Sequence, residues 1–249
     1  MWEFTLNDIN SKTAYINFLY NKLESKVKFV GGIIIRQNTS SKISLSLAVP
    51  NKQKDYFVLL ILELVSEIIT LDYKYDYLES RLGAYIKNEL TKSAFLKALT
   101  VFDKQTDKDL IKKELVLERE LNINSFYNFK LYSLRNRWSD ICDVIETNIS
   151  SIEKADAFGE LLKFLIKTTE IAYDEVHLYK RHKSYLITDR LNKPIDALEP
   201  LEDSGEIKAI KELISLSPAK IILHPSGEYK EPFFDYIFNI FDDKVKMPL

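Results

Sequence analysis

The 249-residue chain is close to electrical neutrality, with 35 Lys and Arg residues against 37 Asp and Glu residues and a formal net charge of −2. This balance excludes a strong overall attraction to nucleic acid or to an acidic membrane. The single cysteine, Cys142, excludes an intrachain disulfide and a thiolate zinc cluster, and the three scattered histidines predict no metal and no other cofactor.

The first ten residues lack the basic and apolar regions of a secretory signal. The most apolar run, residues 57–71, is too short to cross a bilayer comfortably and carries Glu63 and Glu67, so it predicts a buried helix. Together with the low cysteine content, these features predict a cytoplasmic protein without membrane contact.

The N-terminal part of the chain predicts a helix followed by a β-hairpin. Residues 11–24 place apolar side chains on one helical face. Two β-like runs, residues 27–37 and 42–50, are separated by a turn-like Asn-Thr-Ser-Ser sequence. The second run alternates between apolar and small or polar residues, which is typical of a half-buried strand.

The middle of the chain predicts helices only. Residues 73–120 read as several helical pieces with mixed charges on exposed faces. Residues 124–149 have the clearest helical period in the chain and predict one long helix. The predicted core stripe of this helix consists of Tyr127, Leu131, Leu134, Trp138, Ile141, Ile145 and Ile149.

The C-terminal part predicts a mixture of strands and helices. Strands over 174–179 and 184–188 bracket a turn and form a second hairpin. A helix over 204–216, a short buried strand over 220–224 and a last helix that begins near Pro232 follow.

These elements predict an α+β fold that is predominantly helical, with an N-terminal β-hairpin and a C-terminal mixed unit of hairpin, helix and strand. Three segments are expected: a helix–hairpin–helix segment over 1–71, a helical middle over 72–172 and an α+β segment over 173–249. Because no linker separates them, we predict one integrated fold. An isolated hairpin is barely stable in water, so we also expect the two ends to share one sheet.

Residues 121–225 contain a distinctive order of features. A long helix entered through Phe-x-x-Phe-Lys-Leu at 126–131 is followed by an amphipathic helix, a hairpin with a basic tip, and a Ser-Pro-led strand that ends in His-Pro. In this order the chain resembles the YtxC-like family over roughly residues 120–245. Phe126, Phe129 and Leu131 match the family motif, whereas Ser125 and Lys130 replace its Gly and Arg. The family is associated with sporulation in endospore-forming bacteria and has no assigned chemistry, so the resemblance implies a role without a reaction.

Aromatic and basic side chains are interleaved at the start of the predicted long helix. Phe126 and Phe129 lie to one side of the core stripe, close to Lys130 and Arg137. Aromatic rings stack on bases and cations neutralise phosphates, so this pattern is a candidate for binding single-stranded nucleic acid. The alternative is that both phenylalanines pack under a neighbouring helix, as aromatic residues at helical spacing usually do.

The tip of the C-terminal hairpin is a second basic candidate. Lys180, Arg181, His182 and Lys183 are consecutive and would create a local positive patch that binds phosphate or an acidic protein surface. The alternative is an ordinary solvated turn.

Two histidines form the third candidate. Glu175, His177 and Tyr179 share one face of a predicted strand, and a neighbouring carboxylate can tune a histidine for proton transfer. His224 and Ser226 lie where a buried strand ends, a place that often holds ligands. The alternative is that these histidines are structural or merely exposed.

The sequence contains no P-loop, nucleophile elbow, HExxH or CxxC motif, so we predict that the chain is not an enzyme. The first hypothesis is a cytoplasmic sporulation protein that acts through contacts with an unidentified protein partner, in an undefined oligomeric state. One alternative is nucleic-acid binding through helix 126–137 and tip 180–183. The other is an enzyme that acts on a small anionic substrate with His177 or His224.

Overall fold

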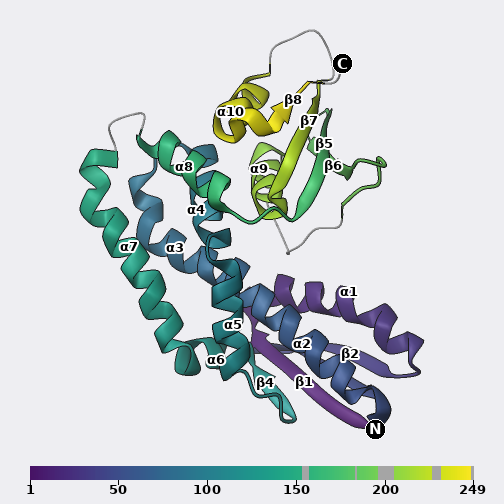
Figure 1. The fold of residues 1–249 in the computed structure, drawn as a ribbon. Helices are drawn as coiled ribbons and strands as arrows, with labels where there is room; N and C mark the ends of the chain where they lie inside the picture. Colours follow the sequence, from purple (N-terminus) through teal and green to yellow (C-terminus); the bar gives the residue numbers. More distant parts are fainter. Residues whose placement is uncertain (153–156, 183, 196–204, 226–230, 248–249) are drawn as a thin grey trace. The chain divides into compact units, whose positions relative to one another are not determined.

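The computed structural model describes residues 1–152, 157–182, 184–195, 205–225 and 231–247 (Figure 1). The chain divides into two compact units. Unit 1 contains Met1–Tyr73 and Lys104–Ser139, and unit 2 contains Lys74–Asp103 and Asp140–Leu249. The units are therefore interleaved along the chain, and their boundaries differ from the three consecutive segments expected from the sequence.

Unit 1 contains a four-stranded sheet in the order β2-β3-β1-β4. The predicted hairpin is present as β2 and β3, which pair antiparallel. Two strands that the sequence did not predict extend it: β1 pairs antiparallel with β3, and the short β4 pairs parallel with β1. The strands of this sheet are β1 Trp2–Ile9, β2 Ile33–Asn38, β3 Lys42–Val49 and β4 Glu120–Asn122.

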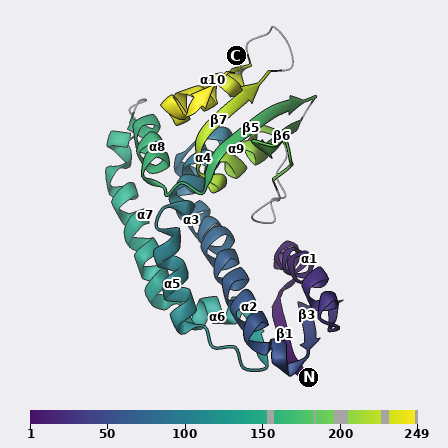
Figure 2. The same cartoon turned by 45° about the vertical axis from the view of Figure 1, so that its right-hand side comes forward.

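Helix α1 covers the apolar face of this sheet (Figure 2). Its buried residues recur at helical spacing and include Leu19, Leu23 and Val27. A Cβ atom on Gly32 would lie 2.9 Å from Val27 and 3.0 Å from Val49, which places this end of α1 directly against β3. The other helical elements of unit 1 are η1 Asn10–Lys12, α1 Thr13–Phe29, η2 Asn51–Gln53, α2 Lys54–Ile68, the π-helical η3 Ile69–Tyr73, α5 Lys104–Glu114 and α6 Ile123–Lys130.

The apolar run over 57–71 is helical, as predicted, and its two carboxylates are used in packing. Glu63 forms ion pairs with Lys108 and Lys112 on α5. Glu67 pairs with Lys104 at 2.9 Å. In the described part of the chain, no helix is both long enough and apolar enough to span a membrane.

The prediction of a single helix over 124–149 is wrong. Helix α6 ends at Lys130, and a second helix, α7, runs from Tyr132 to Ile152. At Leu131 the backbone leaves the helix, with ψ at 34°. The guanidinium of Arg135 donates a hydrogen bond of 2.8 Å to the carbonyl of Asn128, one of the groups left without a helical partner. The apolar period continues through the buried Leu131, so the sequence pattern shows no sign of the break.

Unit 2 contains its own four-stranded sheet, in the order β6-β5-β7-β8. The predicted C-terminal hairpin pairs antiparallel, and β7 lies parallel to β5. The two ends of the chain therefore do not share a sheet, because other strands complete each hairpin's sheet. The strands are β5 Tyr173–Arg181, β6 Ser184–Asp189, β7 Pro218–His224 and β8 Val245–Lys246.

Helices α9 and α10 lie on one side of the unit 2 sheet (Figure 1). The ring of Tyr185 on β6 contacts the rings of Phe233 and Phe234 on α10 at 4.7 and 6.2 Å. The other helical elements of this unit are α3 Lys74–Leu82, η4 Gly83–Tyr85, α4 Glu89–Val101, α8 Ala157–Thr168, α9 Gly205–Leu216, α10 Pro232–Phe241 and η5 Asp242–Lys244. The fold is thus α+β and predominantly helical, as the sequence predicts.

Candidate functional site

The predicted basic and aromatic residues of unit 1 occupy two helices rather than one face of a single helix. Phe126 is buried, with 7% of its surface exposed, so it belongs to the core. Phe129 is 80% exposed, and Lys130 beside it is also exposed. Arg137 is exposed on α7, beyond the break at Leu131. Only Phe129 of the two phenylalanines therefore offers a ring to solvent.

The predicted basic tip is divided between the two faces of its hairpin. Lys180 forms an ion pair of 2.5 Å with Glu231, which precedes α10. Arg181 is exposed and lies one residue further along β5, so it points to the opposite face. His182 occupies the turn with a positive φ of 50°. Lys183 lies outside the described residues.

The third predicted group is brought together on the open face of the unit 2 sheet. His177 on β5 and His224 on β7 are hydrogen-bonded, with 2.9 Å between Nδ1 of His177 and Nε2 of His224. Nε2 of His177 lies 3.1 Å from Oε1 of Glu175. The other carboxylate oxygen of Glu175 accepts a hydrogen bond from Lys220. We call the four residues Lys220, Glu175, His177 and His224 the histidine relay.

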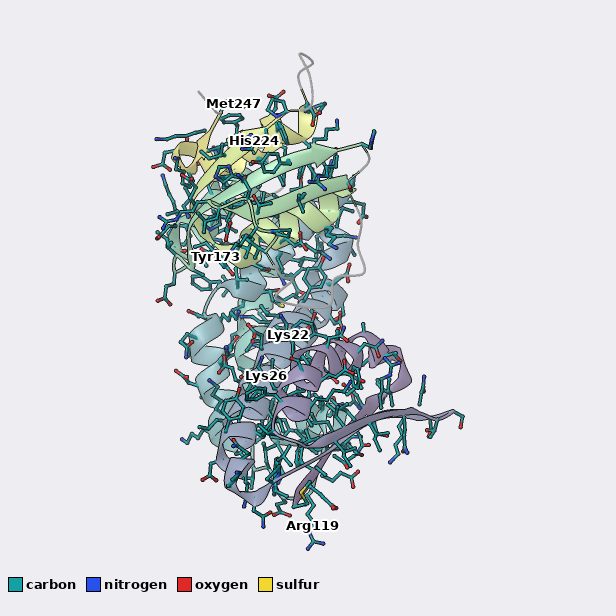
Figure 3. All side chains as sticks on the ribbon, turned by 90° about the vertical axis from the view of Figure 1, so that its right-hand side faces the viewer. Lys22, Lys26, Arg119, Tyr173, His224 and Met247 are labelled. Carbon is teal, nitrogen blue, oxygen red and sulfur yellow. The ribbon has the colours of Figure 1, made fainter. Side chains whose placement is uncertain are left out.

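Alternation along β5 and β7 produces this arrangement. On β5, Val176 and Leu178 are buried beneath the sheet, so the residues between them point to the open face. The parallel register sets Tyr179 opposite His224. Figure 3 shows His224 on its strand, on the side of the sheet that faces the viewer. Ser226, the remaining predicted residue, lies outside the described residues.

An aromatic ring holds the outer histidine in place. The ring of Tyr179 stacks on the ring of His224, with centroids 4.1 Å apart and planes at 12°. The hydroxyl of Tyr179 donates a hydrogen bond of 2.7 Å to Asn192, in the turn that follows β6. Tyr179 is therefore fixed at both ends, and it limits the orientations open to His224.

The surroundings of Glu175 and His224 shift the pKa of each group. The hydrogen bond from Lys220, followed by the one from His177, holds the pKa of Glu175 below its usual range. Burial and, to a lesser extent, the neighbouring His177 lower the pKa of His224. At neutral pH, Glu175 is therefore ionised and His224 is neutral.

Sequence analysis missed two members of this neighbourhood. Lys220 was visible as a member of the alternating pattern with His224 on β7, two residues on either side of Ile222. Asn192 gave no signal, because a turn of the backbone brings it to Tyr179. Among the described residues, no group of three or more His, Cys, Asp or Glu side chains is arranged to hold a metal ion.

Cys142 is buried, and burial raises the pKa of its thiol to about 11. A thiol of such high pKa is protonated at neutral pH and is a poor nucleophile. Cys142 is therefore an inert residue of the core.

A surface groove of about 490 Å³ lies between the end of α1 and the start of α2 in unit 1, and no pattern in the sequence predicts it. Phe29 at its edge is 91% exposed and Tyr56 is 50% exposed. Leu59, one turn beyond Tyr56 on α2, is 67% exposed. We call the groove and these three side chains the α1–α2 groove. The residues that line the groove are Ser25, Lys26, Phe29, Val30, Gln53 and Tyr56.

The turn after α1 explains why Phe29 is presented to solvent. The backbone N–H of Gly31 donates to the carbonyl of Lys28, and that of Gly32 donates to the carbonyl of Val27. These two bonds, with a positive φ of 73° at Gly31, form a Schellman motif that ends the helix. The chain turns into β2 directly after Phe29, so no further helical turn covers its ring.

The sequence model of the YtxC-like family matches residues 60–246. The match covers most of the chain, and the protein therefore belongs to the YtxC-like family. It begins about 60 residues before the segment in which the sequence motifs resemble the family, and it includes the whole histidine relay. Phe29, Tyr56 and Leu59 precede it, so the α1–α2 groove is a feature of this chain that family membership does not address. Comparison with curated proteins and with solved structures gave no match in either set.

Proposed function

We propose that this protein serves the sporulation programme in the cytoplasm as a non-enzymatic protein that acts through contact with another protein. Membership of the YtxC-like family supports the link to sporulation. The α1–α2 groove supports the contact with a partner, since its two aromatic side chains, Phe29 and Tyr56, are at least half exposed, and Leu59 is exposed one turn further along α2. Apolar side chains gathered at one surface depression, with polar residues around them, mark interaction sites more often than single exposed residues do.

The groove has the composition of a site that receives an apolar anchor. Phe29 and Tyr56 come from different helices and flank the depression, so one inserted side chain would contact both rings. Aromatic residues around a central pocket contribute a large share of the binding free energy at protein interfaces.

The charges around the groove favour an acidic partner. Lys26, labelled in Figure 3, is one of the residues that line the groove, and Lys52 and Lys54 flank its Gln53 in sequence. All three lysines are exposed, whereas Asp55 is the acidic neighbour on this side of α2. We therefore propose that the groove binds a segment of another protein in which an apolar anchor is flanked by Asp and Glu residues. Complementary charge of this kind speeds association and selects the partner.

Selection from a random peptide library with the full-length protein tests this proposal. Enriched peptides should contain one or two large apolar residues among acidic ones. Replacement of Phe29 by Ala should raise the Kd of such a peptide by at least about tenfold, which corresponds to the loss of a strong interface contact. Fluorescence anisotropy with a labelled peptide measures this change, and raising the salt concentration should weaken binding through the lysines.

Phe129→Ala is the matched control, because Phe129 is another exposed phenylalanine of the same unit. It should leave the peptide Kd unchanged. Peptides that bind wild type and Phe29→Ala equally, or no enrichment at all, would contradict the proposed groove. Binding of a labelled single-stranded oligonucleotide that is lost in Phe129→Ala and Lys130→Gln would instead favour the nucleic-acid alternative.

The sporulation role is tested in a spore-forming host that carries the gene. Replacing the gene with the Phe29→Ala variant should lower the yield of heat-resistant spores, and the Phe129→Ala variant should not. If deletion of the whole gene leaves spore yield unchanged, the proposed place in sporulation is wrong, whatever the groove binds.

A further inference from the structure

Among the described residues, the histidine relay leaves one ring nitrogen without a hydrogen-bond partner. Both nitrogens of His177 are occupied, one by Glu175 and the other by His224. His224 uses Nε2 for that contact and is only partly buried. Its Nδ1 atom is therefore the outer end of a hydrogen-bonded series that begins at the ammonium group of Lys220.

The direction of the hydrogen bonds follows from the charge of Glu175. An ionised carboxylate only accepts, so Nε2 of His177 carries a proton and donates it to Glu175. When both rings are neutral, Nδ1 of His177 accepts from Nε2–H of His224, and Nδ1 of His224 is an unprotonated acceptor. When the pair gains one proton, Nδ1 of His224 carries N–H and becomes a donor.

We propose that the carboxyl ends of β5 and β7 bind a small phosphate-type oxyanion, held by Nδ1–H of His224 and the guanidinium of Arg181. Arg181 lies two residues after Tyr179 on the same face of β5, about 7 Å along the strand. Tyr179 is opposite His224, so the long side chain of Arg181 can reach a ligand that contacts His224. An Arg fork and an imidazolium N–H are matched donors for phosphate oxygens.

The relay supplies the proton that binding requires. An anion on Nδ1 favours the protonated state of His224, whose Nε2 is hydrogen-bonded through His177 to Glu175. The other charged groups on this face are Lys220, which is paired with Glu175, and Lys246 on β8, beside Ile222. The strand β6 contributes Ser184, Leu186 and Thr188 to the same face, none of which titrates near neutral pH. Affinity should therefore fall as the pH rises and the pair loses its proton.

NMR of the histidine rings in the 15N-labelled full chain provides the test, with inorganic phosphate as the probe at constant ionic strength. The chain has three histidines, and His182 in the hairpin turn is an internal control. Phosphate should shift the Nδ1 signal of His224, raise the pKa of this ring and leave the signals of His182 unchanged. The apparent Kd should rise at least about tenfold between pH 6 and pH 8, as expected when binding requires a proton.

Two variants separate this site from general attraction of anions. Arg181→Gln should weaken phosphate binding at least about tenfold, since it removes the bidentate donor. His224→Gln should weaken binding and remove most of its pH dependence, because it removes the ring that must carry the proton, and His182→Gln should change neither quantity. Phosphate that leaves the signals of His224 unmoved at tens of millimolar, or that shifts His182 equally, would overturn the proposal. These residues belong to unit 2, so the outcome is independent of peptide binding at the α1–α2 groove.

Discussion

The two sheets are built on the same alternation but use their polar residues differently. In unit 1 the open face of β1 and β3 carries short groups that bond to one another, such as Thr5 and Ser46 at 3.0 Å. One of its carboxylates, Asp8, lies instead on the covered face, where the hydroxyl of Tyr73 donates to it at 2.9 Å. In unit 2 the titratable groups line the open face and form the histidine relay. The comparison shows that these polar residues of unit 1 bond to one another or to the core, whereas those of unit 2 form a hydrogen-bonded series on an open face.

The largest expected effect comes from breaking the covered face of unit 1 at Gly32. A Cβ atom there would lie 2.7 Å from the carbonyl oxygen of Ala48, and the backbone cannot yield easily. Gly32→Ala should lower the free energy of unfolding by about 2–3 kcal/mol, the usual cost of overpacking. Gly31→Ala is the matched control. It meets no atom within 4 Å and has only its positive φ to accommodate, so it should cost about 1 kcal/mol. Chemical denaturation measures both, and equal losses would contradict the tight packing of α1 on β3.

The buried carboxylate of Asp8 in unit 1 should make the stability of the protein depend on pH. Burial, the largest effect, raises the pKa of Asp8 to about 6, against an ordinary value of 3.8. The folded state therefore holds the proton more tightly than the unfolded state. The resulting stabilisation is complete below about pH 4 and is lost as the pH rises through 6.

Asp8→Asn should remove this dependence. Between pH 4 and pH 7 the wild type should lose about 2 kcal/mol more of its unfolding free energy than the variant does. Tyr73→Phe should instead enlarge the pH dependence of stability. The hydroxyl of Tyr73 lowers the pKa of Asp8, so its removal should raise that pKa further. Parallel pH profiles of wild type and Asp8→Asn would show that the carboxylate has no such role.

Local sequence patterns predicted most helices and both hairpins, because the spacing of apolar residues and the turn residues can be recognised within a few neighbouring positions. Strand β4 has three residues and is defined only by its parallel pairing with β1, more than a hundred residues away in sequence, so no local signal existed. The break at Leu131 was also hidden, since the apolar period continues across it.

Only the part of the histidine relay that lies within one strand could be predicted from local sequence. The neighbouring positions of Glu175 and His177 follow from the period of a single strand. The partnership of His177 with His224 depends on the parallel pairing of β5 and β7, which joins residues 47 positions apart. The groove in unit 1 was not predictable at all. Phe29 lies one turn after Ser25 and Lys26 on α1, and a helical pattern alone does not show that the chain turns away after it.

The smallest effect on stability, and the sharpest test of the comparison, is expected at His177. Its side chain is 16% exposed and makes two hydrogen bonds on the open face, so His177→Gln should lower the free energy of unfolding by no more than about 1 kcal/mol, the usual net contribution of a hydrogen bond. The same change should raise the pKa of His224 part of the way to its ordinary value, because the repulsion from His177 disappears while the larger effect of burial stays. NMR titration measures this pKa, and His182→Gln serves as the control that should alter neither quantity. A loss of 2 kcal/mol or more in His177→Gln would mean that the relay holds β5 to β7. The polar residues of unit 2 would then be as structural as those of unit 1.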